Sequence, residues 1–276
     1  MSLSISFDDG YKTVYDNTLP LMQNFGFKGT VFVCTERVGV EDFDGEPTMN
    51  LDQLRELESL GWEIGSHGKN HGVLTSLPYG KRELEISESK EFLQRHGFRV
   101  SSFAHPYGVS DEATRKIVSK YYRCARSAFE EQGPYILKGT DFDPHRIPAL
   151  YFASFHFLKR VKRMNGWLTI VFHSISERAP TRRRDNWISL QRFTDFLNNA
   201  RNAGLESFTF VDAFDKIRET EVVTKLSAIT SMRESLIARI WYAIDKISNL
   251  CWVDLCKKCM HAIMTIKTGA NGGARK

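Results

Sequence analysis

Short apolar runs rich in β-branched and aromatic residues alternate with longer amphipathic stretches over the first 220 residues. The runs predict buried strands, and the stretches predict helices. The predicted strands are residues 3–7, 29–34, 62–66, 101–105, 124–128, 145–149, 167–172 and 207–211. The predicted helices are residues 51–60, 79–96, 111–120 and 189–203. This alternation is typical of βα units around a mostly parallel sheet, and the chain length suits one α/β barrel with an appendage.

Beyond Glu221 the pattern changes to apolar residues at spacings of three and four, which predicts one or two amphipathic helices. These residues are Leu236, Ile237, Ile240, Trp241, Ile244, Ile247, Cys251, Leu255 and Cys259. We therefore divide the chain into a barrel domain over residues 1–220, a basic amphipathic helical extension over 221–267, and a glycine-rich tail over 268–276. We expect the tail to be disordered.

The apolar face of the extension is interrupted by Asp245, Lys246 and Asp254, so no run of about 18 to 20 apolar residues can cross a bilayer. A basic helix with Trp241 and Trp252 could lie in a membrane interface, or it could pack on the barrel or on a second copy of the chain. We favour packing on protein, with peripheral membrane contact as the alternative.

Charge and cysteine content narrow the classes of protein. Residues 1–220 carry 29 basic and 29 acidic side chains, whereas residues 221–276 carry 9 and 4, so the whole net charge of +5 lies in the extension and tail. A neutral main domain argues against a nucleic-acid-binding protein. Five scattered cysteines favour a reducing compartment, and no signal peptide is visible after Met1. We therefore expect a cytoplasmic protein, with attachment to the membrane surface as the alternative, unless the chain begins earlier.

Two adjacent carboxylates end the first predicted strand, in Ser6-Phe7-Asp8-Asp9-Gly10. The carboxyl ends of parallel strands are where α/β folds place reactive groups, because the loops there converge on one face. Neighbouring residues of a strand point to opposite sides, so one aspartate can bind a metal ion while the other meets a water molecule. Alone, the motif could equally be a solvated turn.

A pair of histidines follows the third predicted strand, as His67 and His71. Side chains four residues apart share one side of a helical turn, so we expect both imidazoles to reach a single ion. With Asp9 they would form a set of two histidines and one carboxylate, which leaves coordination positions open for water and substrate.

Two further motifs stand at strand ends. Phe103-Ala104-His105-Pro106-Tyr107-Gly108 follows the fourth predicted strand, and His173 follows the apolar run Leu168–Phe172. A lone histidine in such a place is usually structural. Four strand-end motifs in one chain favour a shared catalytic site instead.

In this order the motifs resemble those of the polysaccharide deacetylase family, also known as NodB-homology or carbohydrate esterase family 4 enzymes. The resemblance covers about residues 1–215. It implies a distorted (β/α) barrel of about seven strands and a metal-dependent hydrolase that removes acetyl groups from N-acetylated carbohydrate. By the same resemblance Asp9, His67 and His71 would bind a divalent cation, with Zn²⁺ the first choice and Co²⁺, Ni²⁺ or Mn²⁺ the alternatives.

The resemblance also implies roles in catalysis. Asp8 would be the general base that takes a proton from the attacking water. The backbone N–H of Tyr107 would stabilise the oxyanion, and protonated His173 would give its proton to the leaving group.

The chain departs from the common family pattern before the Pro-Tyr pair. Many members have an arginine two residues before Pro106 that orients the base, whereas this chain has Ala104, followed by His105 next to the proline. A form with an aromatic residue before the proline is similar to that of poly-N-acetylglucosamine deacetylases. We therefore expect His105 and Pro106 to support the substrate site, and we expect Arg146, on the next predicted strand, to orient Asp8.

Other functions are compatible with the same residues. The site could remove O-acetyl groups, or it could act as a deformylase or amidase on a related substrate. The missing arginine also leaves open a carbohydrate-binding barrel that has lost its activity. Cytoplasmic placement favours a soluble or lipid-linked sugar over a mature cell-wall polymer.

Overall fold

The computed structural model describes residues 2–43, 45–128, 135–151, 155–180, 182, 187–221, 223, 224 and 227. Nearly all of them belong to one compact unit, residues 1–220. The extension predicted over 221–267 lies almost entirely outside the described residues and the tail over 268–276 lies wholly outside them, so both stay predictions. In the part of the chain that is described, no helix is both long enough and apolar enough to cross a bilayer.

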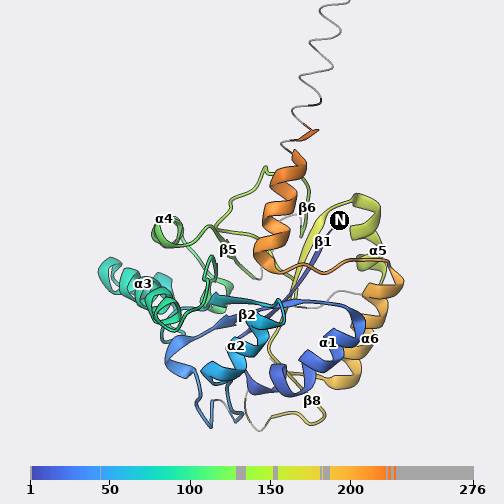
Figure 1. Ribbon diagram of the computed structural model, residues 1–276. Helices are drawn as coiled ribbons and strands as arrows, with labels where there is room; N and C mark the ends of the chain where they lie inside the picture. The colour runs from blue at the N-terminus through green and yellow to red at the C-terminus, as the bar shows by residue number, and fades with distance from the viewer. Residues whose placement is uncertain are drawn as a thin grey trace, which may run out of the picture. The chain divides into compact units, whose positions relative to one another are not determined.

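Seven strands form one curled sheet in the order β5-β4-β3-β2-β1-β7-β6 (Figure 1). They are β1 (Ser2–Asp8), β2 (Gly29–Val33), β3 (Glu63–Ser66), β4 (Ser102–Ala104), β5 (Cys124–Arg126), β6 (Ile136–Leu137) and β7 (Trp167–Phe172). All neighbouring pairs are parallel except β6 and β7. The interior strand β1, between β2 and β7, is buried along its whole length, as expected for a strand covered on both faces. The predicted distorted barrel is therefore confirmed.

Among the described residues, helices α1 to α6 connect the strands and lie around the outside of the sheet (Figure 1). They are α1 (Leu19–Phe25), α2 (Leu51–Ser59), α3 (Tyr79–Arg95), α4 (Glu112–Tyr121), α5 (Phe155–Met164) and α6 (Leu190–Asn202). Shorter helical turns are η1 (Val14–Thr18, a π-helix), η2 (Thr35–Arg37), η3 (Leu74–Ser76) and η4 (Pro106–Gly108). Residues 210–221 are also helical, and β8 (Ser174–Ser176) pairs with β9 (Trp187–Ser189) in a separate two-stranded sheet.

Three of the four predicted helices begin at side-chain caps. Asn50 and Gln53 form a reciprocal capping box at the start of α2, and Asp111 and Ser189 accept hydrogen bonds from the first turns of α4 and α6. These side chains satisfy backbone N–H groups that have no partner within the helix.

Two predicted strands are wrong. Residues 145–149 contribute only an isolated bridge between Ile147 and Arg126, and in residues 207–211 only Ser207 forms a bridge, to Leu3. The run that follows Ser207 turns into the helix at 210–221. Short apolar runs do not distinguish a buried strand from a buried helix or an irregular segment, which explains both errors.

The two faces of the sheet contribute to two clusters of buried side chains. The outer face packs on the helices, with Val31 and Val33 of β2 among its residues. The inner face supplies Phe32 and Trp167, which pack with Phe210 and Phe214 of the helix at 210–221. Because strand residues alternate between faces, the inner positions can be followed along each strand to its end.

Candidate active site

Four titratable side chains meet at the carboxyl end of the sheet, on its inner face. The inner positions of β1 end with Asp8 and those of β5 end with Arg126, while His67 and His173 follow β3 and β7 in the same alternation. The carboxyl ends of neighbouring parallel strands lie at one edge, so these side chains converge there. All four are buried.

Asp8 forms a buried ion pair with Arg126. The Nη2 group of Arg126 donates to both carboxylate oxygens of Asp8, and the two side chains are only 1% and 6% exposed. Burial raises the pKa of Asp8, but the charges of Arg126, His67 and His173 outweigh this effect and lower the pKa to about 2. Asp8 is therefore ionised at neutral pH.

The expectation that Arg146 orients Asp8 is wrong, because Arg146 is exposed and the ion pair is made by Arg126. The segment that carries Arg146 is not a strand, whereas β5 pairs with β4 and places Arg126 beside Ala104. The sequence did hold a signal. An arginine inside an apolar run predicted as a strand is rarely buried unless it has a charged partner.

Asp9 points toward the two histidines. Its backbone is left-handed, with φ of 68°, a conformation that aspartate adopts more readily than most residues. Its Oδ1 atom lies 3.2 Å from Nε2 of His71 and 3.8 Å from Nε2 of His67. One potential ligand atom from each of these three buried residues lies within 4.8 Å of the other two. The structure thus brings together the three residues predicted to bind a metal ion.

The chemistry of these donor atoms fits a divalent cation. A hydrogen bond of 2.8 Å joins Nδ1 of His67 to the carbonyl oxygen of Ala104, which can only accept, so Nδ1 carries the proton and Nε2 presents a lone pair. Burial lowers the pKa of His67 to about 4, against the opposing effect of Asp8, so the ring is neutral. A lone pair of His67 and a carboxylate oxygen of Asp9 therefore face one another, the arrangement that a metal ion requires.

His67 and His71 meet through a loop, and the helical turn predicted for them is absent. Gly68 and His71 have φ of 82° and 59°, and these left-handed residues fold the chain so that the ring centroids are 4.9 Å apart. The backbone N–H groups of Thr35 and Glu36 donate to carbonyl groups of this loop. The two imidazoles therefore do meet, as predicted, but through a loop with left-handed residues and not through a helical turn.

Tyr107 forms a wall of the site beside His71, with ring centroids 4.6 Å apart. It lies in η4 after Pro106, has φ of 58° and is 42% exposed. Gly108 follows with φ of 70°, and a Cβ atom there would come within 2.8 Å of the backbone of Ala128. Among the described residues, Asp9, His71 and Tyr107 are three of the four non-glycine residues with positive φ. Such backbone strain concentrates at functional sites.

His105 helps to hold η4, the turn that carries Tyr107. It is fully buried, and its Nε2–H donates to the carbonyl oxygen of His145 at 2.9 Å. Burial lowers the pKa of His105 to about 4, so the ring is neutral. His105 therefore ties η4 to the segment after β5, and it is not one of the residues grouped around Asp9.

His173 places a second imidazole next to Asp8. Its Nε2 atom lies 4.0 Å from Oδ2 of Asp8, and its ring stacks on that of Tyr151 with centroids 5.6 Å apart and an interplanar angle of 17°. The site thus holds a carboxylate and an imidazole near one place where a cation can bind. Groups of this kind can catalyse hydrolysis by a water molecule.

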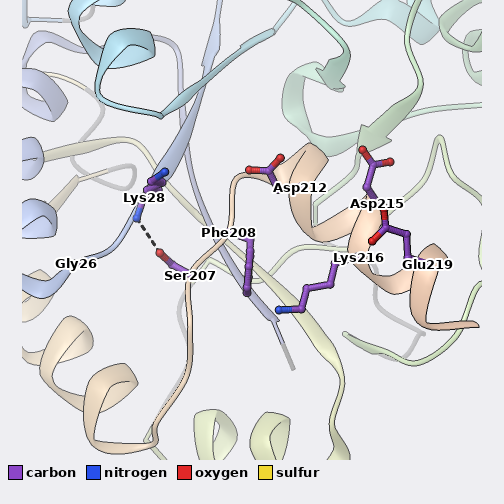
Figure 2. A pocket seen from close by; sticks show the side chains of 8 residues that line it. All are labelled: Gly26, Lys28, Ser207, Phe208, Asp212, Asp215, Lys216 and Glu219. Atoms are coloured by element: carbon purple, nitrogen blue, oxygen red, sulfur yellow. Dashed lines mark hydrogen bonds between the residues drawn. The ribbon is translucent and has the colours of Figure 1, made fainter. Parts of the chain in front are cut away.

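A cavity of about 690 Å³ lies at the opposite end of the sheet. Figure 2 shows the residues that line it, with the backbone N–H of Lys28, which precedes β2, donating to Oγ of Ser207. The lining residues are Gly26, Lys28, Ser207, Phe208, Asp212, Asp215, Lys216 and Glu219. Asp215 is paired with Arg123, and Lys216 with Glu206. The cavity contains none of the predicted site residues, so its size does not make it the stronger candidate.

Comparison with known proteins finds relatives of this chain in sequence and in structure. The sequence model of the family described as polysaccharide deacetylase matches residues 1–123, which include Asp8, Asp9, His67, His71 and the Pro106–Gly108 turn. The poly-β-1,6-N-acetyl-D-glucosamine N-deacetylase of Staphylococcus aureus is 24% identical over 179 residues. That match covers 60% of this chain and 59% of the relative, so the chain spans about three fifths of that protein's length.

Solved structures show the same fold. The peptidoglycan deacetylase PdaC from Bacillus subtilis superimposes with a TM-score of 0.53 and 16% identity, over 82% of this chain and 95% of that one. The Xyl-CE4 domain of a multidomain xylanase from the hindgut metagenome of Trinervitermes trinervoides gives a TM-score of 0.51 and 15% identity, over 78% and 89% of the two chains.

Proposed function

We propose that this chain is a member of the polysaccharide deacetylase family, whose sequence model matches residues 1–123, and that it hydrolyses the acetamide group of an N-acetylated glycan or glycan precursor. The observation that carries the proposal is the convergence of Asp8, Asp9, His67, His71 and His173 at one end of the sheet. The relative from Staphylococcus aureus, which is named for an N-acetylglucosamine polymer, supports an N-acetyl substrate.

Asp9, His67 and His71 would hold the metal ion, with Zn²⁺ as our first choice because two imidazoles and a carboxylate suit it. Bound there, such an ion supplies Lewis acidity for the acetyl carbonyl and lowers the pKa of water. Co²⁺, Ni²⁺ and Mn²⁺ remain alternatives, since nitrogen and oxygen ligands also suit them.

The side chains around that site divide the proton transfers. Asp8, kept ionised by Arg126, accepts a proton from the attacking water as the new C–O bond forms. The backbone N–H of Tyr107 donates to the developing oxyanion. His173 gives a proton to the nitrogen as the C–N bond breaks, so acetate leaves and the sugar retains an amine.

The activity is tested by acetate release from N-acetylated chito-oligosaccharides, with the full chain supplied with Zn²⁺. We expect release by the wild type and loss of about 100-fold or more in Asp8→Asn and His173→Gln, since general acid and base groups contribute about 10²–10⁴-fold. Arg146→Gln, at an exposed position, is the matched control and should keep wild-type activity. Equal rates in wild type and Asp8→Asn would refute the proposal.

Metal binding is tested separately by mass spectrometry of the purified protein. Near-stoichiometric metal is expected in the wild type and in His96→Ala, a histidine at the end of α3, and loss of metal is expected in His67→Ala. A metal-free wild type after metal supplementation would contradict the assignment of Asp9, His67 and His71.

The alternatives use the same residues. An acetylated ester and a formamide, assayed beside the chito-oligosaccharide, separate O-deacetylation and deformylation from N-deacetylation. An inactive sugar-binding barrel was motivated by the missing arginine, and Arg126 now fills that role. Turnover by the wild type would exclude such a barrel.

A further inference from the structure

His173 stands where the chain passes from one sheet to another. The ladder between β1 and β7 ends with the pair Phe7 and Phe172, and Ser174 begins β8, which pairs only with β9 among the described strands. His173 itself belongs to neither strand. The hydrogen bonds of the residues just after it therefore help to decide where its imidazole lies.

Those hydrogen bonds come from the segment that follows the two aspartates. The backbone N–H of Ile175 donates to Oγ1 of Thr13 at 3.3 Å, and the Thr13 hydroxyl donates to Oγ of Ser174, also at 3.3 Å. Asn17 adds a bond from Nδ2 to the carbonyl oxygen of Ile175 at 2.9 Å. One short segment thus links the end of β1, which carries Asp8, to the start of β8.

The same segment is held firmly on its other side. Tyr11 forms an antiparallel bridge with Thr48, and the N–H of Met49 donates to the carbonyl oxygen of Gly10 at 2.9 Å. Immediately after Thr13 the chain forms η1, a π-helical turn. Such turns are rare and occur frequently at functional sites.

The buried carboxyl group of Glu46 lies beside the hydroxyl of Ser174. Glu46 is 9% exposed, and its Oε2 atom has no hydrogen-bond partner among the described residues. Burial raises the pKa of Glu46, while the hydroxyl of Ser174 lowers it. A buried carboxylate with an unsatisfied oxygen weakens the fold, so stability alone does not explain this cluster next to His173.

We propose that Thr13 is a positioning residue for His173, acting through its hydrogen bonds to Ser174 and Ile175. These bonds hold the chain after β7 so that the imidazole stays beside Asp8. The catalytic consequence rests on the proposed function, in which His173 protonates the leaving group. The effect of Thr13 on the position of the His173 imidazole does not depend on the proposed function.

Two variants of Thr13 test the kinetic consequence on N-acetylated chito-oligosaccharides. Thr13→Val keeps the shape and removes the hydroxyl, and we expect kcat to fall about 10- to 100-fold, the effect of misplacing a catalytic group by about 1 Å. KM and metal content should stay within about twofold of the wild type, because substrate binding is not altered. Thr13→Ser restores the hydroxyl and should recover most of kcat.

Thr18→Val is the matched control. Thr18 lies at the end of the same π-helical turn and is fully buried, but its hydroxyl has no hydrogen-bond partner among the described residues. It should therefore keep wild-type kcat. An equal loss in Thr13→Val and Thr18→Val, or no rescue by Thr13→Ser, would show that Thr13 has only a packing role.

Ser174→Ala tests whether Thr13 acts on His173 through Ser174. If Thr13 acts through Ser174, the loss in the double variant Thr13→Val/Ser174→Ala should be well below the sum of the two single losses, since residues in one network are not additive. Full additivity would contradict the proposed path.

A spectroscopic measurement keeps this inference separate from the proposed function. In ¹⁵N-histidine spectra of the Zn²⁺-supplied full chain, His173 is assigned from the signals that vanish in His173→Gln. These signals should shift in Thr13→Val and return in Thr13→Ser, whereas those of His96 stay fixed. Unchanged His173 signals in Thr13→Val overturn the proposal, even if the wild type proves active. A wild type inactive on every substrate would remove the proposed function alone.

Discussion

At the amino end of β3, Glu63 accepts hydrogen bonds from Thr30, Ser102 and the backbone N–H of Val211. At the carboxyl end of the same inner face, the Nε2 atom of His67 directs a lone pair toward Asp9. Both groups are polar and sit inside the same sheet, four residues apart in sequence. Glu63 has its partners within the protein, whereas His67 belongs to the cluster that could bind a metal ion.

The backbone differs in the same way between the two ends. Near the amino end, the helix at 210–221 packs Phe210 and Phe214 against Phe32 and Trp167 of the inner face. At the carboxyl end, Asp9, His71 and Tyr107 adopt left-handed conformations that cost energy. The comparison teaches that the amino end stabilises the fold, while the carboxyl end is shaped for chemistry at the expense of stability.

The largest expected effect is at Arg126. Arg126→Gln leaves the carboxylate of Asp8 buried without its cation, so unfolding should become easier by about 3–5 kcal/mol in urea denaturation. Arg146→Gln should change stability by less than about 0.5 kcal/mol, as expected at an exposed position. Removing the acid as well, in Asp8→Asn/Arg126→Gln, should recover part of the loss. If the single and double variants are equally unstable, the ion pair is not the cause.

The second-largest expected effect is stabilisation by a metal ion, which should depend on the carboxyl end of the sheet and not on the amino end. Zn²⁺ at 100 times its dissociation constant should raise the free energy of unfolding by about 2.7 kcal/mol, because only the folded site binds it. In Asp9→Asn, which tolerates the left-handed backbone but lacks the charge, this gain should disappear. Glu63→Gln at the amino end should keep the gain. A gain of equal size in all three proteins would place the ion elsewhere.

Truncation at the amino end should cost stability without touching the metal ion. Glu63→Ala leaves the donors of Thr30, Ser102 and Val211 without their acceptor, which should lower the free energy of unfolding by about 1–3 kcal/mol. Its metal content, measured by mass spectrometry, should equal that of the wild type. Loss of metal in this variant would contradict the separation of the two ends.

The smallest effect is a pH dependence. Burial raises the pKa of Glu63 above its usual 4.5, against opposing hydrogen bonds from Ser102, Val211 and Thr30. The folded protein thus holds this proton more tightly than the unfolded chain, so the contribution of Glu63 to stability is largest below pH 4.5 and declines as the pH rises above it. Urea denaturation from pH 4 upward should show the stability difference between wild type and Glu63→Gln falling with pH.

Glu83 provides a control of opposite sign. Its hydrogen bond with Lys120 lowers the pKa of Glu83, so its contribution is present above pH 4.5 and is lost as the pH falls. The difference between wild type and Glu83→Gln should therefore rise with pH. If the stability differences for Glu63→Gln and Glu83→Gln change with pH in the same direction, burial of Glu63 does not cause its pH dependence.

The positions of the motifs could be predicted from the sequence, because each follows from local rules. Apolar runs placed β1, β3, β4 and β7, and the alternation of faces put Asp8 and His173 at strand ends. The resemblance of the motifs then gave the metal ligands, which the structure groups together. The extension over 221–267 remains a prediction from the same kind of pattern.

Contacts between distant segments were beyond the sequence. Arg126 pairs with Asp8 across 118 residues, and Thr13 reaches Ser174 across 161. The histidine loop closes through the left-handed Gly68 and His71, a conformation that their spacing does not reveal. The sequence by itself therefore determined which residues stand at the strand ends, since that depends on periodicity within each strand. Only the tertiary structure decided which of them touch, because that depends on how separate strands and irregular segments are brought together.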